Sequence, residues 1–365
     1  MQVEAPFCAN ARQRLTGLLF RAFLVIAVFA LPLCQFRAAL AVELHNLQLF
    51  RPRGVPDTYT RTLNITSSPR EFQVLSLFNP FEKQSLLVTP DARPGLTITE
   101  NFPRLDGSTS FLPVYAVVFK AIYRAPSEGE ALTKYKTSIR CSSSRGFASF
   151  LEGRSDIFFG FEPSDEFKRQ AEESGAALRL IPLGKEAFVF CVNVNNPVNS
   201  LTLEEVRKIY SGALTNWAEL GGPDRPIAPF RRKISSGSQT VMERHVMQGT
   251  PFARESLQSA TTMLDLLDHV ARDYRDDMAI GYSFLWFVTE MAGVPGIKTL
   301  SLNGVYPDTN AIRSARYPLI VPFYAIVREG GVSPETQALL NWLTGPEGQA
   351  LIAKVGYVPL GEKTP

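Results

Sequence analysis

Three short stretches rich in serine and threonine are the parts of this sequence best suited to chemistry. They cover residues 106–110, 141–146 and 235–240, which read Asp-Gly-Ser-Thr-Ser, Cys-Ser-Ser-Ser-Arg-Gly and Ser-Ser-Gly-Ser-Gln-Thr. Each comes just before a predicted helix, whose first amides lack partners within the helix and carry partial positive charge. Because glycine permits close backbone approach and hydroxyls donate hydrogen bonds, this pattern predicts binding of a small anion.

A basic cluster, Arg231–Lys233, directly precedes the third stretch. The planar guanidinium of arginine matches two oxygens of a tetrahedral oxyanion. The same hydroxyls are also ordinary helix N-caps, and neighbouring arginines often form a solvated surface. The residues alone leave both interpretations open.

Other kinds of site find little support in the sequence. There is no Cys-x-x-Cys pair, and the three histidines, His45, His245 and His269, lie far apart. This argues against cysteine-based zinc sites and iron–sulfur clusters. The absence of a Gly-x-Ser-x-Gly motif argues against a serine hydrolase. We therefore expect no catalytic residues, no metal and no cofactor.

The composition is that of a globular protein long enough for about two domains. Of the 365 residues, 45% are hydrophobic and 20% are charged. The first 41 residues carry four arginines and one glutamate, which leaves 34 basic and 34 acidic side chains in the remainder. This balance argues against a nucleic-acid partner and against an obligate binder of membrane surfaces.

Residues 1–41 predict a secretory signal peptide. Three arginines precede an apolar run over residues 22–34, and Ala39-Leu-Ala41 forms a small-residue cleavage site. The run is short for a membrane span. An uncleaved N-terminal anchor and lipoprotein processing at Cys34 remain alternatives. A cleaved leader predicts a periplasmic protein.

The cysteines of the mature chain leave two possibilities open. Removal of the leader would leave only Cys141 and Cys191. Export makes a disulfide between them possible, but both lie in apolar, strand-like sequence where buried free thiols are common.

The local pattern changes at about residue 103. Residues 42–102 contain β-like pieces at 72–78 and 95–99 and predict a small β-rich extension. From residue 103, short apolar strands alternate with helices, which indicates an α/β fold. The expected strands are 156–159, 187–193 and 319–327, and the expected helices begin at Pro113 and Pro334, or lie over 147–151, between Thr202 and Gly212, over 237–248 and before Gly356.

A run of motifs then carries a resemblance. Residues 209–222 read Ile-Tyr-Ser-Gly-Ala-Leu-Thr-Asn-Trp-Ala-Glu-Leu-Gly-Gly, and further matching segments are 107–115, 232–240, 279–283, 317–324, 345–350 and 356–360. Together they resemble the phosphate-binding component of bacterial ABC-type phosphate importers, the PstS-like family. The likeness covers residues 103–360.

The resemblance implies a two-lobed type II periplasmic-binding-protein fold, preceded by the small N-terminal extension. Two α/β lobes would be joined by crossover strands near 187–193 and 319–327, with the ligand in the cleft between them. The first lobe would comprise residues 103–193 and 316–365, and the second lobe residues 194–315.

The resemblance also implies which residues hold the ligand through hydroxyls, amides and one guanidinium. They are Thr109 and Ser110 in the first stretch, Ser143 and Ser144 in the second, and Arg232, Ser238, Gln239 and Thr240 in or near the third.

The chain departs from the family pattern at three positions. Ser110 stands where the family has phenylalanine, and Gln239 replaces a glycine. The family aspartate that accepts the phosphate proton aligns with Glu162 if one residue is inserted. Because sulfate has no proton to donate, a carboxylate acceptor favours phosphate, and Glu162 is the expected selectivity residue.

Together these observations predict an exported, monomeric solute-binding protein that captures phosphate or a similar oxyanion and delivers it to a membrane ABC permease. One alternative is a related sensory or adhesion protein without transport, which the additional segment 42–102 would suit. Another is a phosphatase that accepts a phosphate ester at the same site.

Overall fold

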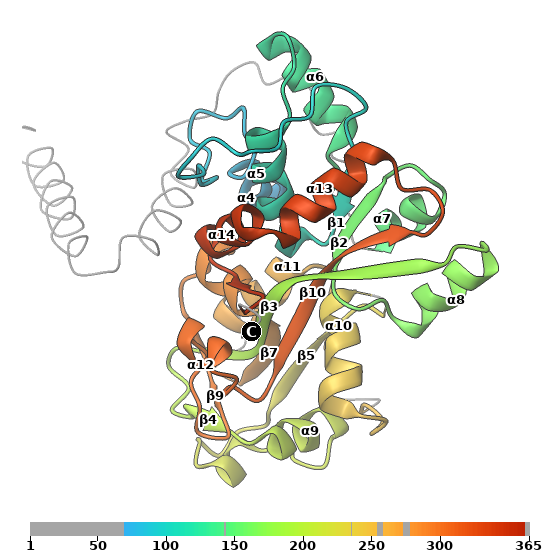
Figure 1. Cartoon of the computed structure of the whole chain (residues 1–365). Helices are drawn as coiled ribbons and strands as arrows, with labels where there is room; N and C mark the ends of the chain where they lie inside the picture. Colours follow the sequence, from blue (N-terminus) through green and yellow to red (C-terminus); the bar gives the residue numbers. More distant parts are fainter. Residues whose placement is uncertain (1–68, 142–143, 235, 254–257, 273–277, 362–365) are drawn as a thin grey trace, which may run out of the picture. The chain divides into compact units, whose positions relative to one another are not determined.

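The computed structural model describes residues 69–141, 144–234, 236–253, 258–272 and 278–361 (Figure 1). The predicted signal peptide, residues 42–68 of the extension, and Ser143 lie outside these ranges. Within them, no helix is both long enough and apolar enough to cross a membrane.

Helices and strands alternate along most of the described chain. The helices, including the short 3-10 helices η2 and η3 and the π-helices η4 and η5, are α4 (Pro69–Ser76), η2 (Thr109–Phe111), α5 (Leu112–Ile122), α6 (Glu128–Ser138), α7 (Ser144–Leu151), α8 (Asp165–Glu173), α9 (Leu203–Ser211), η3 (Trp217–Leu220), α10 (Gly237–Val241), η4 (Met242–Met247), α11 (Met263–Arg272), η5 (Phe287–Met291), α12 (Thr309–Arg313), α13 (Pro334–Thr344) and α14 (Pro346–Val355). The strands are β1 (Leu105–Gly107), β2 (Ile157–Gly160), β3 (Leu178–Asn193), β4 (Ser200–Leu201), β5 (Ala228–Arg232), β6 (Gln258–Ala260), β7 (Ala279–Phe284), β8 (Ile297–Thr299), β9 (Ser301–Leu302), β10 (Ile320–Arg328) and β11 (Val358–Pro359).

One nine-stranded sheet runs through the described chain in the order β1-β2-β10-β3-β7-β5-β6, and β11 and β8 also pair with β3. β1 is parallel to β2, and β5 is parallel to both β6 and β7. The central pairs β2–β10, β10–β3 and β3–β7 are antiparallel. The parallel pairs therefore flank an antiparallel centre.

Strand β3 connects the two ends of this sheet. Residues 178–187 pair with β10, which pairs in turn with β2, whereas residues 188–192 pair with β7. Figure 1 shows the two long strands β3 and β10 side by side. The strands predicted at 187–193 and 319–327 are thus confirmed.

β3 also begins earlier than predicted, at Leu178. The strand contains Pro182 and Gly184, and its register with β10 shifts at this point, between Phe323 and Tyr324. A shift in the ladder tolerates a proline, which has no amide to donate. Gly184 is required by packing, since a Cβ there would lie 2.7 Å from both the ring of Phe323 and the carbonyl of Val358.

Helix boundaries follow the local signals closely. Thr202 and Glu205 form the predicted capping box at the start of α9, and Gly212 ends this helix in the left-handed conformation with φ 79°. α14 ends at Gly356 in the same way, with φ 114°. α10 continues directly into η4, which ends at Gln248.

The core lies along the sheet and the helices packed on it. The largest fully buried side chains of β3 and β7 are aromatic, among them Phe188, Phe190 and Tyr282. α11 contacts β3, β5 and β7, whereas α13 and α14 contact β3, and α7 contacts β1 and β2. Burial of these apolar side chains is the main source of stability and fixes the strand ends relative to one another.

The strand predicted at 72–78 is wrong, because this segment contains helix α4. Its buried side chains, Val74, Leu75 and Phe78, have helical rather than alternating spacing. The piece at 95–99 forms a single bridge between Ile98 and Tyr123. The described part of the extension packs on the body of the protein, where the ring of Phe78 lies 5.9 Å from that of Trp286.

Cys141 and Cys191 are both buried and form no disulfide. Cys191 lies on β3, and burial raises the pKa of its thiol to about 12. The structure therefore shows two buried thiols and not the disulfide that the sequence left possible.

Candidate functional site

The ends of β1, β2 and the start of α10 meet at a small cavity of about 30 Å³. A cavity needs roughly 10–15 Å³ to hold one water molecule, so this one has room for a small group of atoms. Its polar wall contains Ser108, Ser164 and Thr240, and its remaining lining residues are Phe147, Phe158, Gly160, Phe161, Glu162, Pro163, Phe167, Gly237 and Ile326.

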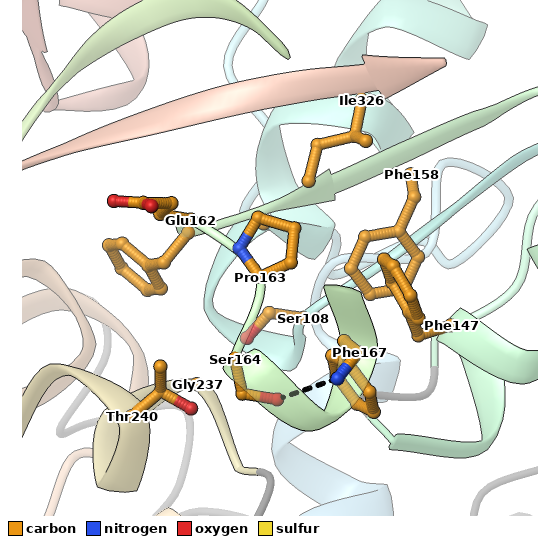
Figure 2. Close-up of a pocket in the computed structure, with 12 residues that line it drawn as sticks. Ser108, Phe147, Phe158, Glu162, Pro163, Ser164, Phe167, Gly237, Thr240 and Ile326 are labelled. Atoms are coloured by element: carbon orange, nitrogen blue, oxygen red, sulfur yellow. Dashed lines mark hydrogen bonds between the residues drawn. The ribbon is translucent and has the colours of Figure 1, made fainter. Parts of the chain in front are cut away.

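Figure 2 shows how these side chains divide the cavity. Phe147, Phe158 and Phe167 gather on one side, and Thr240 of α10 lies on the other. Phe147 and Phe167 are stacked, with ring centroids 4.3 Å apart. The carboxylate of Glu162 points away from these aromatic rings. A bound ion would therefore meet polar groups on one side and aromatic rings on the other.

Ser108 is the residue of the first predicted stretch that lines the cavity. Gly107 lies so close to β2 that a Cβ would be 2.3 Å from the carbonyl oxygen of Phe159, and this contact explains the glycine. Ser108 precedes η2, and its Oγ lies 3.2 Å from Oγ of Ser110. Ser110 is buried and Thr109 is partly exposed, but neither lines the cavity.

A buried carboxylate supports this first loop. Asp106 is 1% exposed, and its Oδ1 accepts a hydrogen bond of 2.8 Å from the amide of Gly107. A Cβ at Gly146 in the first turn of α7 would lie 3.0 Å from this carboxylate. Asp106 therefore lies against the helix of the second stretch. Ser144 begins α7, and Ser143 lies outside the described residues.

Glu162 lies directly after β2 and is held by two cations. Its Oε1 accepts from Nζ of Lys168 at 2.7 Å, and its Oε2 lies 3.1 Å from Nη1 of Arg244. Burial raises the pKa of Glu162, but the Lys168 hydrogen bond and the charge of Arg244 outweigh it and bring the pKa below its ordinary value. The carboxylate is therefore ionised at neutral pH and acts as an acceptor.

A neighbouring histidine does not add positive charge to this side of the site. His245 lines a second pocket of about 80 Å³ together with Glu162 and Arg244. Burial and the nearby Arg244 charge lower the pKa of His245, against the opposing effect of Glu162. The imidazole is therefore mostly neutral at pH 7.

Arg232 ends β5 and is buried, with 9% of its surface exposed. Its backbone amide donates to the hydroxyl of Tyr282 at 2.9 Å and to Oε1 of Gln239 at 3.2 Å. Tyr282 also donates to Oε1 of Gln239. Arg232 is not among the residues that line the cavity of Figure 2.

The side chain of Gln239 connects α10 to the sheet. Besides accepting from Arg232 and Tyr282, it donates through Nε2 to Glu243 at 2.9 Å. Gln239 is 1% exposed. These contacts use its carboxamide inside the protein, so only its backbone amide is positioned at the helix start.

The start of α10 is capped in the ordinary way. Ser236 accepts from the amide of Gln239 at 3.3 Å, and the hydroxyl of Thr240 donates to the carbonyl of Ser236 at 3.2 Å. Ser238 is buried and does not line the cavity. Because a hydroxyl can rotate, Thr240 can exchange its backbone partner for a ligand oxygen.

The structure thus brings Glu162 and Thr240 of the predicted residues to one cavity, together with Ser108 of the first predicted stretch and Gly237 of the third. Sequence reasoning missed the other polar lining residues, Ser108 and Ser164, and it missed Arg244. The position of Ser108 within the first stretch was a usable signal. Arg244 gave none, because its partners are about eighty positions earlier in the chain. Among the described residues, no group of three or more His, Cys, Asp or Glu could hold a metal ion.

Comparisons with known sequences identify the family to which the chain belongs. A family model described as the PBP superfamily domain matches residues 103–347. The phosphate-binding protein PstS of Bacillus subtilis is 25% identical over 210 residues, which cover 57% of this chain and 64% of that protein. PstS of Staphylococcus epidermidis is 23% identical over 236 residues, which cover 62% of this chain and 71% of that protein. The chain thus spans just under two thirds of the Bacillus relative.

Solved structures match over a similar part of the chain. A Clostridium perfringens protein, crystallised with bound phosphate and assigned to the substrate-binding proteins of phosphate ABC transporters, matches with a TM-score of 0.55 and 24% identity, covering 73% of this chain and all of that one. An ABC-type phosphate transport receptor from Vibrio cholerae matches with a TM-score of 0.52 and 21% identity, covering 71% and 100%. These matches confirm the predicted type II periplasmic-binding-protein fold.

Proposed function

Because the chain belongs to the PBP superfamily, we propose that it is an exported solute-binding protein that captures inorganic phosphate for an ABC importer. The observation that carries this proposal is the small cavity at which the ends of β1 and β2 meet the start of α10. Two relatives are named phosphate-binding proteins, and these names are the reason for proposing phosphate as the ligand. The charge balance of the chain after residue 41 argues against nucleic acid as a partner.

Capture depends on two lobes, residues 103–193 with 316–365 and residues 194–315. The continuous strand β3 supports this division, because its two parts pair with β10 on one side and with β7 on the other. An anion that contacts both lobes binds the closed arrangement better than an open one, and so shifts the equilibrium between them.

Several groups contribute to recognition of the anion. The hydroxyls of Ser108, Ser164 and Thr240 face the cavity and can donate to oxyanion oxygens. Arg232 supplies positive charge from the end of β5 and compensates the charge of the anion. Glu162, ionised and held by Lys168 and Arg244, accepts a hydrogen bond from the protonated oxygen of phosphate. Thr109, Ser110, Ser143, Ser144, Ser238 and Gln239 complete the proposed set through hydroxyls or backbone amides.

The protein acts as a monomeric carrier, without metal, cofactor or catalytic step. It is made with a leader over residues 1–41, works in the periplasm, and hands its ligand to a membrane permease. The names of its relatives favour this role over adhesion, sensing or ester hydrolysis.

The test is isothermal titration calorimetry of the mature protein with phosphate, sulfate and molybdate. Replacement of Arg232 by alanine should weaken phosphate binding by at least about 2 kcal/mol, because a buried anion loses its cationic partner. Arg231→Ala is the matched control, since neighbouring residues of a strand face opposite sides. Unchanged phosphate affinity in the Arg232 variant would remove this residue from the site, and no affinity of the unmodified protein for any of the three anions would refute the function.

A further inference from the structure

We infer that Arg244 controls how long the anion stays bound, by bridging two walls of the cavity without contacting the anion. This inference rests on the proposed function. The first wall is the segment 161–165, which follows β2 and ends with the first residue of α8, and the second is the continuous helix formed by α10 and η4. Arg244 belongs to the second wall, in the π-helical turn η4.

Three contacts connect Arg244 to the first wall. Nη1 lies 3.1 Å from Oε2 of Glu162, and Nη2 donates to the carbonyl of Pro163 at 3.2 Å and to Oδ1 of Asp165 at 3.1 Å. We call this set the Arg244 bridge. Its partners are consecutive or nearly so in sequence, so one guanidinium holds the whole turn.

The Arg244 bridge lies beside the cavity. Thr240 lines the cavity of Figure 2, the second pocket and an open depression of about 430 Å³. Arg244 lines the second pocket and the depression, but not the cavity of Figure 2. Asp165 and Ser164 line the depression next to it. An anion that leaves the cavity past Thr240 toward the second pocket or the depression therefore meets Arg244.

Separation of the two walls requires that these contacts break. Glu162 is held at its other oxygen by Lys168 of α8, the helix that continues from the first wall, so the carboxylate cannot simply follow Arg244. The rings of Phe161 and Phe284 add an apolar contact between the first wall and β7, with centroids 4.0 Å apart. The side chains of Glu162 and Asp165 are 41% and 94% exposed, so water screens the pairs and the Arg244 bridge can open and close reversibly.

For one variant, a simple charge effect and the Arg244 bridge predict opposite changes in the rate at which the anion is released. Asp165→Asn removes a negative charge close to the bound anion, and electrostatics alone would then slow release of the anion. The same change removes one contact of the Arg244 bridge, and the inference predicts faster release. Glu166→Gln is the matched control: it makes the same charge change in the same first turn of α8, lines the same depression, and pairs with Arg169 and Gln170.

The experiment measures release of ³²P-labelled phosphate from the full-length mature protein after addition of excess unlabelled phosphate. We expect release to be roughly two- to fivefold faster in Asp165→Asn and about tenfold faster in Arg244→Ala, and not faster in Glu166→Gln. Raising the salt concentration should shrink the difference between the parent and Asp165→Asn. Release from Asp165→Asn that is no faster than from Glu166→Gln would overturn the inference.

A second measurement separates failure of this inference from failure of the proposed function. Small-angle X-ray scattering without phosphate should give a larger radius of gyration for Arg244→Ala than for the parent protein. If the parent binds no phosphate, the proposed function fails, while the scattering comparison still tests the Arg244 bridge. Equal radii would refute the Arg244 bridge whatever the ligand is.

Discussion

At the residue scale, the hydroxyls around the cavity already have partners within the protein. Ser108 lies at hydrogen-bond distance from Ser110, Ser164 caps α8 by accepting from the amide of Phe167, and Thr240 donates to the carbonyl of Ser236 (Figure 2 shows the Ser164 bond). Of the three, only Ser164 is a helix cap: Ser108 makes no capping hydrogen bond, and Thr240 bonds from inside α10 to the residue that caps this helix. Rotation can turn each hydroxyl toward an oxyanion.

The role proposed for Glu162 is to favour phosphate over sulfate. Glu162→Gln should lower the ratio of phosphate to sulfate affinity by about tenfold, because the amide no longer offers an ionised acceptor for the phosphate proton. Calorimetric titration with both anions gives the ratio directly. The variant also weakens the Arg244 bridge, but that loss affects both anions alike and cancels in the ratio. Asp165→Asn, which weakens the same bridge, should leave the ratio unchanged; equal ratios for Glu162→Gln and the parent protein would contradict the assignment.

At the scale of elements, Gln239 determines how α10 sits on the sheet. Its carboxamide accepts from the backbone of Arg232 on β5 and from the hydroxyl of Tyr282 on β7, and donates to Glu243 on η4. The resemblance assigned a glycine to this position, which could make none of these contacts. In this chain, therefore, the helix that presents Thr240 and Arg244 is fixed to the strand that carries Arg232.

Removal of this side chain should destabilise the protein. We expect Gln239→Ala to lower the free energy of unfolding by about 1–3 kcal/mol, because it leaves buried donors on Arg232 and Tyr282 without this acceptor. Urea denaturation followed by circular dichroism measures the change. Gln170→Ala on α8, where the amide bonds to Glu166 one turn away, should change it by no more than about 0.5 kcal/mol. A double variant with Tyr282→Phe should be less destabilised than the sum of the two single changes.

At the scale of the whole molecule, the crossing strand β3 carries a buried acid. Glu186 is 3% exposed and lies beside the point where β3 changes its partner from β10 to β7. Its Oε1 accepts from the amides of Ala187 and Trp286, and its Oε2 has no hydrogen-bond partner within the described ranges. Burial raises the pKa of Glu186 to about 8, against the effect of the two amides. The side chain is therefore mostly protonated at neutral pH.

This acid should make stability depend on pH. The ordinary pKa is 4.5, so between about 4.5 and about 8 the folded chain holds a proton that the unfolded chain has lost. The contribution of Glu186 to stability is fully present below pH 4.5 and is lost as the pH rises through 8, at no more than about 1.4 kcal/mol per pH unit. The free energy of unfolding of the parent, relative to Glu186→Gln, should therefore fall between pH 5 and pH 8. Denaturation curves at pH 5, 6.5 and 8 test this. The free energy of unfolding of the exposed control Glu172→Gln should change with pH in parallel with that of the parent. A free energy of unfolding of Glu186→Gln that also changes in parallel with the parent would exclude the effect.

Features that depend only on neighbouring residues could be predicted from the sequence. The capping box at Thr202 and Glu205, the glycine that ends α14, and the hydroxyl stretches before α7 and α10 are all local patterns, and the structure has these elements where they were expected. Ordered motifs over most of the chain were enough to identify the family and its fold. The prediction of a strand at 72–78 was wrong because a short apolar segment fits both the two-residue period of a strand and the 3.6-residue period of a helix.

Contacts between distant residues, by contrast, became known from the folded structure. It extended β3 through Pro182 because a register shift with β10 accommodates the proline, and it directed the carboxamide of Gln239 inward because three partners from other elements surround it. It also brought Arg244 to Glu162 and lined one side of the cavity with phenylalanines. Such contacts join residues far apart along the chain, and they depend on how the sheet orders its strands, which local pattern does not encode.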